Sequence, residues 1–354
     1  MAEICRMLCK AEHQSDGTHP LRGSVNIVML SFIPWIVNLE LTNACNLSCV
    51  FCNHRELKKT MRIGDMNTTL LEKILKEIAG GFPGGKLYEL GLVGLGEPTL
   101  ARHLLEDLQI ISRYADRIER ISLNSNLVKL TLHLADRLLD SPINAYTFSL
   151  NASNPKTYRR LMGKDRFSHV VEHLRIFLKR RFQKGSCPSV AVQVIDSEDN
   201  DLNQLVSCFA DEMLSDVKFF ERKIYTKPLF RKEFSGVNLH AIDESDRYPC
   251  FDIHSRIYVD VNGFAYPCTI GNDCYREKSN LCLGNVHESS LLDLFNGPVN
   301  QAAWERQLGG QLAFPECAVC NIWNFTPNNF TWDTAARRWH VKEKQIRAYG
   351  LKNG

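Results

Sequence analysis

Three cysteines in one short stretch have the types and spacing of metal ligands. Residues 42–53 read TNACNLSCVFCN, and the thiols are Cys45, Cys49 and Cys52. Three soft thiolates within eight residues can hold an iron-sulfur cluster in a compact loop and leave one iron open to another ligand. Zinc is the alternative, but zinc sites usually answer a C-x2-C pair with a second pair, and only His54 follows at short range. The spacing therefore favours a cluster.

The arrangement C-x3-C-x-Phe-C resembles the signature of the radical S-adenosylmethionine (SAM) superfamily. In that family the three cysteines hold a [4Fe-4S] cluster whose open iron binds the amino and carboxylate groups of SAM. Reductive cleavage of SAM then gives a 5'-deoxyadenosyl radical. The resemblance implies that Cys45, Cys49 and Cys52 are cluster ligands and that Phe51 belongs to the cofactor site. It also implies an external one-electron donor of the flavodoxin or ferredoxin type.

Alternating strands and helices must position this loop. The apolar run at 35–41 predicts a strand buried on both faces, so the cysteine loop begins at a strand's carboxyl end. Later strands are predicted at 87–93, 118–123, 145–150, 190–195 and 217–220, and helices at 66–79, 100–114, 130–139, 155–162, 170–181 and 202–214. Six strand-helix units in series predict an α/β fold with a parallel sheet closed or half closed into a barrel. The resemblance implies the same fold, a partial (β/α)6 TIM-like barrel.

The second predicted strand ends in a glycine-rich stretch, Val93-Gly-Leu-Gly-Glu-Pro98. Glycines let the backbone approach a ligand, and the Glu97 carboxylate can accept from an ammonium group. The stretch resembles the GGEP motif of the family, although Leu95 stands where the first of two adjacent glycines is usual. The resemblance assigns Gly94, Gly96, Glu97 and Pro98 to the SAM site. The alternative is a glycine turn with Glu at the start of a helix.

The fourth predicted strand ends in Phe148-Ser-Leu-Asn-Ala-Ser153, which resembles the ribose-contacting motif of the family. Ser149 and Asn151 point the same way under strand alternation and are expected to hydrogen-bond SAM. The alternative is a cap for the helix that follows, a role that suits Ser153 or Asn154 better than Ser149.

Two other strands supply further candidates. Asn124 and Asn126 follow the third strand and face the same barrel mouth. The fifth strand, at 190–195, lacks the glycine-containing adenine motif common in the family. Gln193 either takes the place of that motif or is a buried amide bonded to a neighbour.

A second set of cysteines follows the predicted barrel. Asn262-Gly263 lies between β-rich arms at 257–261 and 264–266 and predicts a hairpin. The hairpin can bring together two thiols, and a C-x2-C pair supplies two more, which closes a four-thiolate site. The four cysteines are Cys250, Cys268, Cys317 and Cys320.

The order C-x12-G-x4-C, gap, C-x2-C resembles the twitch half of a SPASM domain. The resemblance implies one auxiliary [4Fe-4S] cluster, and therefore two [4Fe-4S] clusters in the protein. A structural four-cysteine zinc ribbon is the alternative, because the same thiolates suit either metal. Cys274 and Cys282 lie between the two halves of the set. Each is either a spare ligand, a buried small hydrophobe or a hydrogen-atom donor.

The predicted domains are an N-terminal extension (1–34), the radical SAM partial barrel (35–235), a small twitch/SPASM-like iron-sulfur domain (236–330) and a C-terminal helix (331–354). The helix is expected over 335–349, packed on the barrel, rather than as a nucleic-acid contact. In the extension, Cys5 and Cys9 are incidental thiols or a further metal pair.

Composition excludes several classes of protein. The 354 residues include 43 basic and 40 acidic residues, and a net charge of +3 leaves no electrostatic footprint of a nucleic-acid binder. Thirteen cysteines without a signal peptide argue against a secreted disulfide framework and for reduced thiols in a cytoplasmic protein. The apolar run at 25–37 is interrupted by Pro34 and is too short to span a membrane, so no membrane partner is expected.

The resemblance implies an oxidoreductase that abstracts hydrogen from a small polar substrate, such as a sugar or aminocyclitol, and oxidises it through the auxiliary cluster. An epimerase is the first alternative, in which Cys274 or Cys282 returns a hydrogen atom. A peptide-modifying maturase is the second, but the 34 residues before Trp35 are short of the roughly 50 that a folded peptide-binding domain needs. A non-catalytic electron carrier would not need the residues predicted at the barrel mouth.

Overall fold

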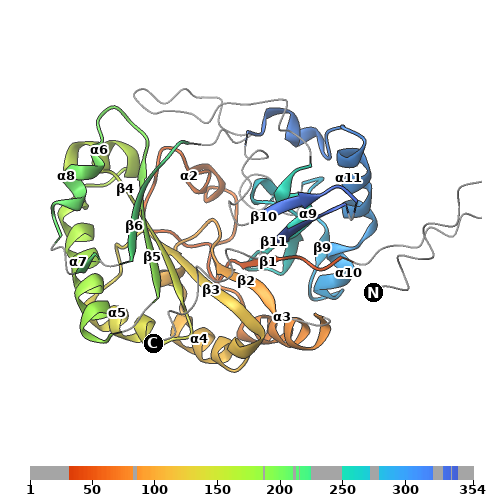
Figure 1. Cartoon of the computed structure of the whole chain (residues 1–354), viewed down its shortest axis with the longest axis horizontal. Coiled ribbons are helices and arrows are strands. Elements are labelled where there is room, and N and C mark those ends of the chain that lie inside the picture. Colours follow the sequence, from red (N-terminus) through yellow and green to blue (C-terminus); the bar gives the residue numbers. More distant parts are fainter. Residues whose placement is uncertain are drawn as a thin grey trace, which may run out of the picture. The chain divides into compact units, whose positions relative to one another are not determined.

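A nine-stranded sheet organises the part of the chain that the structure describes (Figure 1). The computed structural model describes residues 32–82, 86–185, 188–209, 213–214, 216–224, 249–271, 279–321, 330–335 and 337–341. The strand order is β6-β5-β4-β3-β2-β1-β7-β8-β9, and β1 to β7 pair in parallel. The strands are β1 (Ile36–Leu39), β2 (Leu87–Leu92), β3 (Ile118–Ser125), β4 (Ala145–Asn151), β5 (Ser189–Ile195), β6 (Val217–Arg222), β7 (Arg256–Val259), β8 (Phe264–Tyr266) and β9 (Gly284–Asn285).

Most helices between the first six strands lie along the outer face of the curved sheet, whereas the short helix just after the cysteine loop lies on its inner side (Figure 1). The helices are α2 (His54–Leu57), α3 (Thr68–Gly81), α4 (Leu104–Ser112), α5 (Leu132–Leu139), α6 (Pro155–Met162), α7 (Phe167–Gln183) and α8 (Leu202–Val206), with 3-10 turns η1 (Pro98–Leu100) and η2 (Ala115–Arg117). Within the described residues β6 and β9 are the edges, so the sheet does not close. The predicted α/β class and partial (β/α)6 barrel are confirmed.

Periodicity and capping residues explain where these helices form. The apolar positions of α3 recur at helical spacing and are all buried, at Leu70, Leu71, Ile74, Leu75 and Ile78. Asn67, Thr131 and Asn154 accept hydrogen bonds from the first turns of α3, α5 and α6, which satisfies backbone donors that have no partner within the helix.

The helix predicted at 202–214 is shorter in the structure, where α8 ends at Val206. The Ser207 hydroxyl donates to the Gln204 carbonyl at 2.8 Å, and the Cys208 thiol lies 3.5 Å from the same oxygen. Side chains that bond nearby carbonyls in this way compete with the helix ladder.

The predicted hairpin at Asn262-Gly263 is confirmed by the antiparallel pairing of β7 with β8. Gly263 has φ +86°, the left-handed conformation that glycine adopts without strain. Because β7 also pairs with β1, the sheet of the barrel continues into the second cysteine region. Three helices there were not predicted, namely α9 (Phe251–Ser255), α10 (Leu291–Phe295) and α11 (Pro298–Leu308). The predicted domain boundary at 235–236 falls outside the described residues and stays a prediction.

The predicted C-terminal helix is wrong where the structure describes it. Residues 338–341 form the strand β11 (Arg338–Val341), which pairs antiparallel with β10 (Phe330–Asp333). Tertiary contact explains the difference, because Phe330 packs edge-to-face on the rings of Trp35, Tyr88 and Phe251 and anchors this hairpin. Residues 1–31, with Cys5 and Cys9, and residues 342–354 lie outside the described part.

No helix among the described residues combines the length and the apolar character needed to cross a bilayer.

Candidate functional site

The three cysteines of the loop after β1 are half-buried. Burial raises the pKa of Cys45 to about 11, with smaller contributions to this rise from the charges of Glu97 and Cys52. Burial also raises the pKa of Cys49, as do the neighbouring thiols Cys52 and Cys45. The loop backbone is bonded to the end of α6, where the amides of Ser48 and Val50 donate to the carbonyls of Met162 and Leu161. Three thiols on a loop that is held in this way can serve as the ligands of a cluster.

Asn43 fixes the start of this loop. Its side chain accepts from the Gly64 amide at 2.8 Å and donates to the Arg62 carbonyl at 3.0 Å. The His54 Nε2 atom lies 2.9 Å from the Asn43 carbonyl oxygen, so this ring nitrogen bonds the loop backbone rather than a thiol.

Glu97 lies at the end of β2 beside the loop, and its carboxylate is 3% exposed. It accepts four hydrogen bonds, from the Thr99 amide (3.2 Å), the Thr99 hydroxyl (2.6 Å), the Ser125 hydroxyl (2.8 Å) and the Asn126 amide (2.7 Å). Burial raises the pKa of Glu97, and these donors oppose the rise. Glu97 therefore caps η1, as the helix-start alternative expected, and also places a buried carboxyl near Cys45.

The glycines of this stretch make room for neighbouring protein atoms, and their role at the SAM site stays a prediction. A Cβ at Gly94 would lie 2.5 Å from Cγ of Glu40, and one at Gly96 would lie 2.2 Å from the Thr42 carbonyl oxygen. The Glu97 amide donates to the Ala44 carbonyl at 2.8 Å. The second strand end is thus packed directly on the cysteine loop.

Glu40 is a site residue that the sequence did not point to. It is 1% exposed, and its carboxylate accepts from the Leu95 amide at 2.7 Å and from the Val261 amide at 3.5 Å. It therefore joins the loop after β2 to the hairpin of the second cysteine region. A buried glutamate in an apolar strand was the only available signal.

The other predicted residues of the first site are placed as follows. Phe51 is half-buried and packs on the core, whereas Pro98 is buried and begins η1. Asn124 on β3 and Ser149 on β4 are half-buried at the strand ends. Ser149 lies opposite Gln193 in the sheet.

The alternation that paired Ser149 with Asn151 breaks between them. The register of β4 against β5 shifts there, and Asn151 has φ +66° in the left-handed region. Gln193 donates to Asn151 Oδ1 at 2.9 Å and accepts from Arg222 Nη1 at 3.2 Å. These are the bonds expected of the buried-amide alternative.

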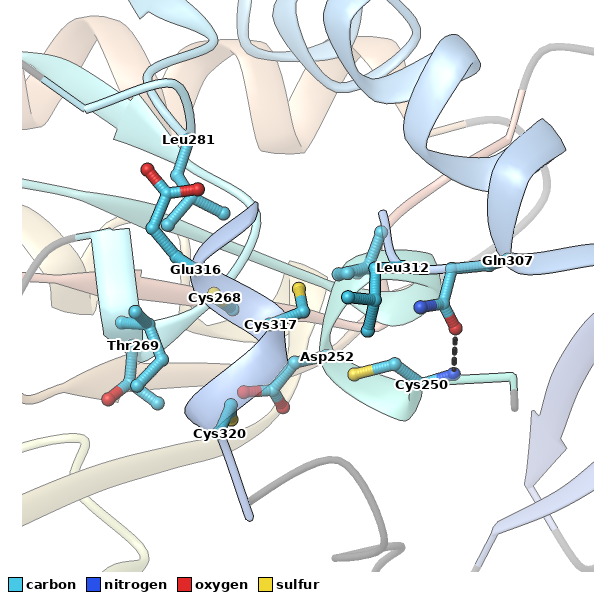
Figure 2. A pocket seen from close by; sticks show the side chains of 12 residues that line it. Cys250, Asp252, Cys268, Thr269, Leu281, Gln307, Leu312, Glu316, Cys317 and Cys320 are labelled. Atoms are coloured by element: carbon cyan, nitrogen blue, oxygen red, sulfur yellow. Dashed lines mark hydrogen bonds between the residues drawn. The ribbon is translucent and has the colours of Figure 1, made fainter. Parts of the chain in front are cut away.

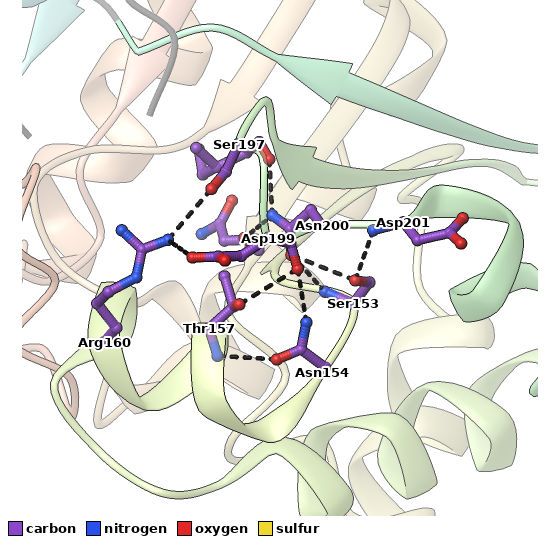
Figure 3. A network of polar contacts seen from close by, with 10 residues as sticks. Ser153, Asn154, Thr157, Arg160, Ser197, Asp199, Asn200 and Asp201 are labelled. Atoms are coloured by element: carbon purple, nitrogen blue, oxygen red, sulfur yellow. Dashed lines mark hydrogen bonds and ion pairs between the residues drawn. The ribbon is translucent and has the colours of Figure 1, made fainter. Parts of the chain in front are cut away.

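A polar network that the sequence did not reveal holds the Asn151–Ser153 segment (Figure 3). Asn200 accepts from the Ser153 amide at 2.8 Å and donates to the carbonyls of Ile195 (2.7 Å) and Asn151 (3.4 Å). The Ser153 hydroxyl accepts from the Asp201 amide at 2.8 Å, and Asn154 caps α6 as expected. Asn200 therefore joins the ends of β4 and β5.

The second set of cysteines surrounds one cavity (Figure 2). Cys250, Cys268 and Cys320 are buried, and Cys317 is half-buried. Burial raises the pKa of both Cys250 and Cys268, and the charge of Asp252 raises each further. Gln307 accepts from the Cys250 amide at 2.9 Å. The structure thus brings together the four thiols that the sequence grouped.

Asp252 lines the same cavity and forms an ion pair with Arg256, with Oδ1 3.2 Å from Nε. Both side chains are largely buried, and Arg256 also donates to the Tyr258 hydroxyl at 3.1 Å. Sequence spacing gave no signal for either residue.

The donor sets fit iron-sulfur clusters. Within the described residues, no three Cys, His or acidic side chains converge closely enough to hold a single ion. The fit rests on the type and grouping of the donors, because three thiols belong to one strand-end loop, four line one cavity, and soft thiolates are the ligands of such clusters.

The two remaining cysteine candidates are not at either site. Cys282 precedes β9 at the edge of the sheet, where its sulfur lies 3.9 Å from the Gly284 carbonyl oxygen, and it does not line the four-thiol cavity. Cys274 lies outside the described residues.

Sequence comparison identifies both regions. The profile described as "Radical SAM superfamily" matches residues 39–206, and the one described as "Iron-sulfur cluster-binding domain" (SPASM) matches residues 250–321. The chain carries a radical SAM domain followed by a SPASM domain. The radical SAM domain contains the Cys45 loop, and the SPASM domain contains all four cavity cysteines. The two domains imply SAM and [4Fe-4S] clusters as cofactors.

Relatives by sequence are distant. The chain is 25% identical over 207 residues to a probable GTP 3',8-cyclase of Thermococcus kodakarensis, covering 55% of this chain and 64% of that one. It is 30% identical over 141 residues to a probable GTP 3',8-cyclase of Saccharolobus islandicus, covering 39% of this chain and 42% of that one. The radical SAM and SPASM chain thus spans less than two thirds of the length of these relatives.

Solved structures share the fold of this radical SAM and SPASM chain. BtrN in complex with AdoMet and 2-DOIA matches with a TM-score of 0.54 and 15% identity, over 82% of this chain and 94% of that one. Native anSMEcpe with bound AdoMet and Cp18Cys peptide matches with a TM-score of 0.56 and 17% identity, over 82% and 86%. SuiB of Streptococcus suis bound to S-adenosylmethionine matches with a TM-score of 0.51 and 16% identity, over 76% and 67%.

Proposed function

We propose that this protein is a radical SAM oxidoreductase that oxidises a small polar substrate, such as a sugar or an aminocyclitol, and uses its auxiliary cluster as the electron acceptor. The observation that carries the proposal is the cavity lined by Cys250, Cys268, Cys317 and Cys320, in a region whose hairpin pairs with β1 of the barrel. Four thiols close such a site to substrate, which suits a cluster that accepts electrons rather than binds the reactant.

When bound, the reduced cluster with SAM supplies a 5'-deoxyadenosyl radical that takes a hydrogen atom from the substrate, and the auxiliary cluster accepts the electron that the substrate gives up. Cys45, Cys49 and Cys52 hold the first cluster in this proposal. Glu97 offers a buried carboxylate to the SAM ammonium, since its Oε2 accepts only one of the four hydrogen bonds found in the described residues.

The side chains at the strand ends orient the rest of SAM in this proposal. Ser149 and Asn151 lie at the end of β4, and Asn200 donates to the backbone carbonyl of Asn151, which is in the left-handed conformation. Asn124 supplies a further polar group from β3. A rigid set of this kind aligns the reacting atoms before reaction.

Structural coverage is compatible with a small substrate, although the chain also covers 86% of anSMEcpe bound to a peptide. The match covers 94% of BtrN, which was solved with 2-DOIA, but 67% of SuiB. BtrN thus has little structure without a counterpart in this chain, whereas a third of SuiB has none.

Epimerisation has less support than oxidation. It requires a hydrogen-atom donor beside the substrate, and Cys282 lies next to the edge strand β9, with β8, β7, β1, β2 and β3 between it and β4. The other candidate, Cys274, is outside the described residues.

The test is turnover of the anaerobically reconstituted enzyme in deuterated water, with a panel of aminocyclitols and amino sugars that includes 2-DOIA. Oxidation predicts 5'-deoxyadenosine formation that depends on the substrate, and a product lighter by two hydrogen atoms without solvent deuterium at the reacting carbon. Cys282→Ala and Cys274→Ala should have little effect. A product of unchanged connectivity carrying one deuterium, with turnover lost in one of these variants, would establish epimerisation instead.

A further inference from the structure

One buried tyrosine beside the cysteine loop carries a hydroxyl that no described residue satisfies. Tyr158 lies on α6 and is 0% exposed. Within the described part of the chain its hydroxyl has no hydrogen-bond partner. A buried hydroxyl in this state costs free energy, so native proteins rarely keep one unless it serves a bound group. Tyr158 therefore calls for a functional explanation.

Two other tyrosines are buried as deeply, and the fold satisfies both of them. The Tyr146 hydroxyl donates to the Leu138 carbonyl at 2.7 Å. The Tyr266 hydroxyl donates to Asp260 Oδ2 at 3.2 Å. Burial of a tyrosine in this protein thus comes with a partner for its hydroxyl in these two cases, and Tyr158 is the exception among the three.

The position of Tyr158 points to the partner. Helix α6 is docked on the cysteine loop, and the Met162 sulfur lies 3.8 Å from Cys49 Sγ. Tyr158 precedes Met162 by four residues, or about one turn, so the two side chains share the face of α6 that meets Cys49. The hydroxyl is therefore carried by the helix face that covers the cysteine loop.

Electrostatics keep this hydroxyl protonated. Burial raises the pKa of Tyr158, and the charge of Cys49 adds to the rise, with a smaller contribution from Glu97 and an opposing one from Arg166. A tyrosine that retains its proton can donate a hydrogen bond. The sulfur atoms of an iron-sulfur cluster carry negative charge and accept such bonds, which raises the reduction potential of the cluster.

We propose that Tyr158 is a positioning residue for the first cluster, and that its hydroxyl donates a hydrogen bond to a sulfur of that cluster on the side of Cys49. The inference rests on the part of the proposed function that gives the first cluster to Cys45, Cys49 and Cys52. One-electron reduction makes the cluster more negative and strengthens the bond, while no covalent bond forms or breaks. Tyr158 thus makes the first cluster easier to reduce.

The test compares Tyr158→Phe with the matched control Tyr146→Phe in reconstituted holoenzyme. Each change removes one buried hydroxyl and keeps the ring. Redox titration followed by electron paramagnetic resonance, without SAM, gives the midpoint potential of the first cluster, whose signal is identified as the one that changes when SAM is added to a separate sample. Iron content, SAM affinity and the unfolding midpoint of the cluster-free chain are measured alongside.

Tyr158→Phe should keep the iron content of the parent and lower the equilibrium constant for reduction of the first cluster roughly tenfold, which is about 59 mV for one electron. In deuterated water, electron-nuclear double resonance should detect a deuteron coupled to this cluster in the parent and in Tyr146→Phe, and lose it in Tyr158→Phe. The control should keep the parent's potential.

Stability separates a cluster contact from a structural one. Cluster-free Tyr158→Phe should unfold at the parent's temperature or above it, because it loses a hydroxyl that no described residue satisfies. Cluster-free Tyr146→Phe should unfold at a lower temperature, because it loses the bond to the Leu138 carbonyl.

An unchanged potential or an unchanged deuteron coupling in Tyr158→Phe would overturn the inference. So would a loss of iron, or a lower unfolding midpoint of its cluster-free form, because either result would give the hydroxyl a structural role. Parent-like potential with weaker SAM binding would assign the hydroxyl to SAM instead. A parent that shows the predicted shift and oxidises no substrate of the panel would support the inference and sink the proposed oxidation. A parent without a SAM-sensitive cluster would sink both.

Discussion

The cysteine loop and the four-thiol cavity hold similar chemistry by different means. The loop takes its three thiols from eight consecutive residues, and all three are half-buried. The cavity collects its four thiols from three separate places between residues 250 and 320, and three of them are buried. One site is a short piece of sequence placed on a barrel, whereas the other is a part of the core.

This difference predicts different consequences of damage. The loop is held by backbone bonds to α6 and by the packing of Gly94 and Gly96 against Glu40 and Thr42, none of which needs the thiols themselves. Cys250, Cys268 and Cys320 instead belong to the main hydrophobic core. We therefore expect loss of the loop thiols to abolish catalysis alone, and loss of the cavity thiols to lower both catalysis and the stability of the fold.

The largest expected effect comes from removing each thiol set. Reconstituted parent should hold about eight irons per chain, and either Cys45, Cys49 and Cys52→Ala or all four cavity cysteines→Ala should reduce this to about four. The loop variant should lose SAM cleavage. Its thermal unfolding midpoint should stay near that of parent protein in which the cysteine loop holds no cluster. The cavity variant should unfold at a clearly lower temperature, because a cluster in the core contributes to folding.

Iron analysis and thermal unfolding followed by circular dichroism check this comparison. Equal unfolding midpoints in the two variants would contradict it. Zinc without iron after anaerobic preparation would contradict the assignment of both sites.

The next effect concerns Glu97 at the first site. Glu97→Gln should weaken SAM binding more than tenfold, since the loss of a charge-assisted hydrogen bond costs about 1.5 to 3 kcal/mol. Ser149→Ala should cost about 1 kcal/mol, as expected for a neutral hydroxyl. Equilibrium binding of SAM to the reconstituted variants measures both. Parent-like affinity in both variants would mean that the strand ends do not bind SAM.

A smaller effect is expected at the network in Figure 3. Asn200→Ala removes the bonds that join the ends of β4 and β5 and should weaken SAM binding roughly fivefold, which is about 1 kcal/mol. Asn154→Ala is the matched control, because it removes the cap of α6 within the same network and should lower stability by about 1 kcal/mol. The control should keep parent-like SAM affinity. If both variants lose affinity equally, Asn200 has no special role in positioning Asn151.

The smallest effect is a change of redox potential without loss of either cluster. Asp252→Asn removes a negative charge from the wall of the cavity, so reduction of the auxiliary cluster should become easier and its midpoint potential should rise. Glu316→Gln, at a half-buried residue of the same wall, should cause a smaller rise. Redox titration followed by electron paramagnetic resonance, in the variant background without Cys45, Cys49 and Cys52, isolates this cluster. A lower potential in Asp252→Asn would contradict the prediction.

Sequence by itself determined the features that depend on neighbours along the chain. The thiol spacing of residues 45–52 survives in the structure because those residues form one loop. Asn262-Gly263 forms its hairpin because the left-handed conformation needed at Gly263 costs glycine little. The alternation of strands and helices is likewise a local pattern, and it predicted the parallel sheet. Its element ends were less reliable, as the early end of α8 at Val206 demonstrates.

Only the tertiary structure decided the features that depend on residues distant in sequence. It packs Gly94 against Glu40 and Gly96 against Thr42. It joins Asn151 to Asn200, and it pairs residues 338–341 as a strand with β10, where a helix was predicted. A strand is stabilised by its partner, and a buried polar group by whichever donor or acceptor the fold brings to it. Neither partner can be identified from spacing along the chain, which is why these features appear only in the folded protein.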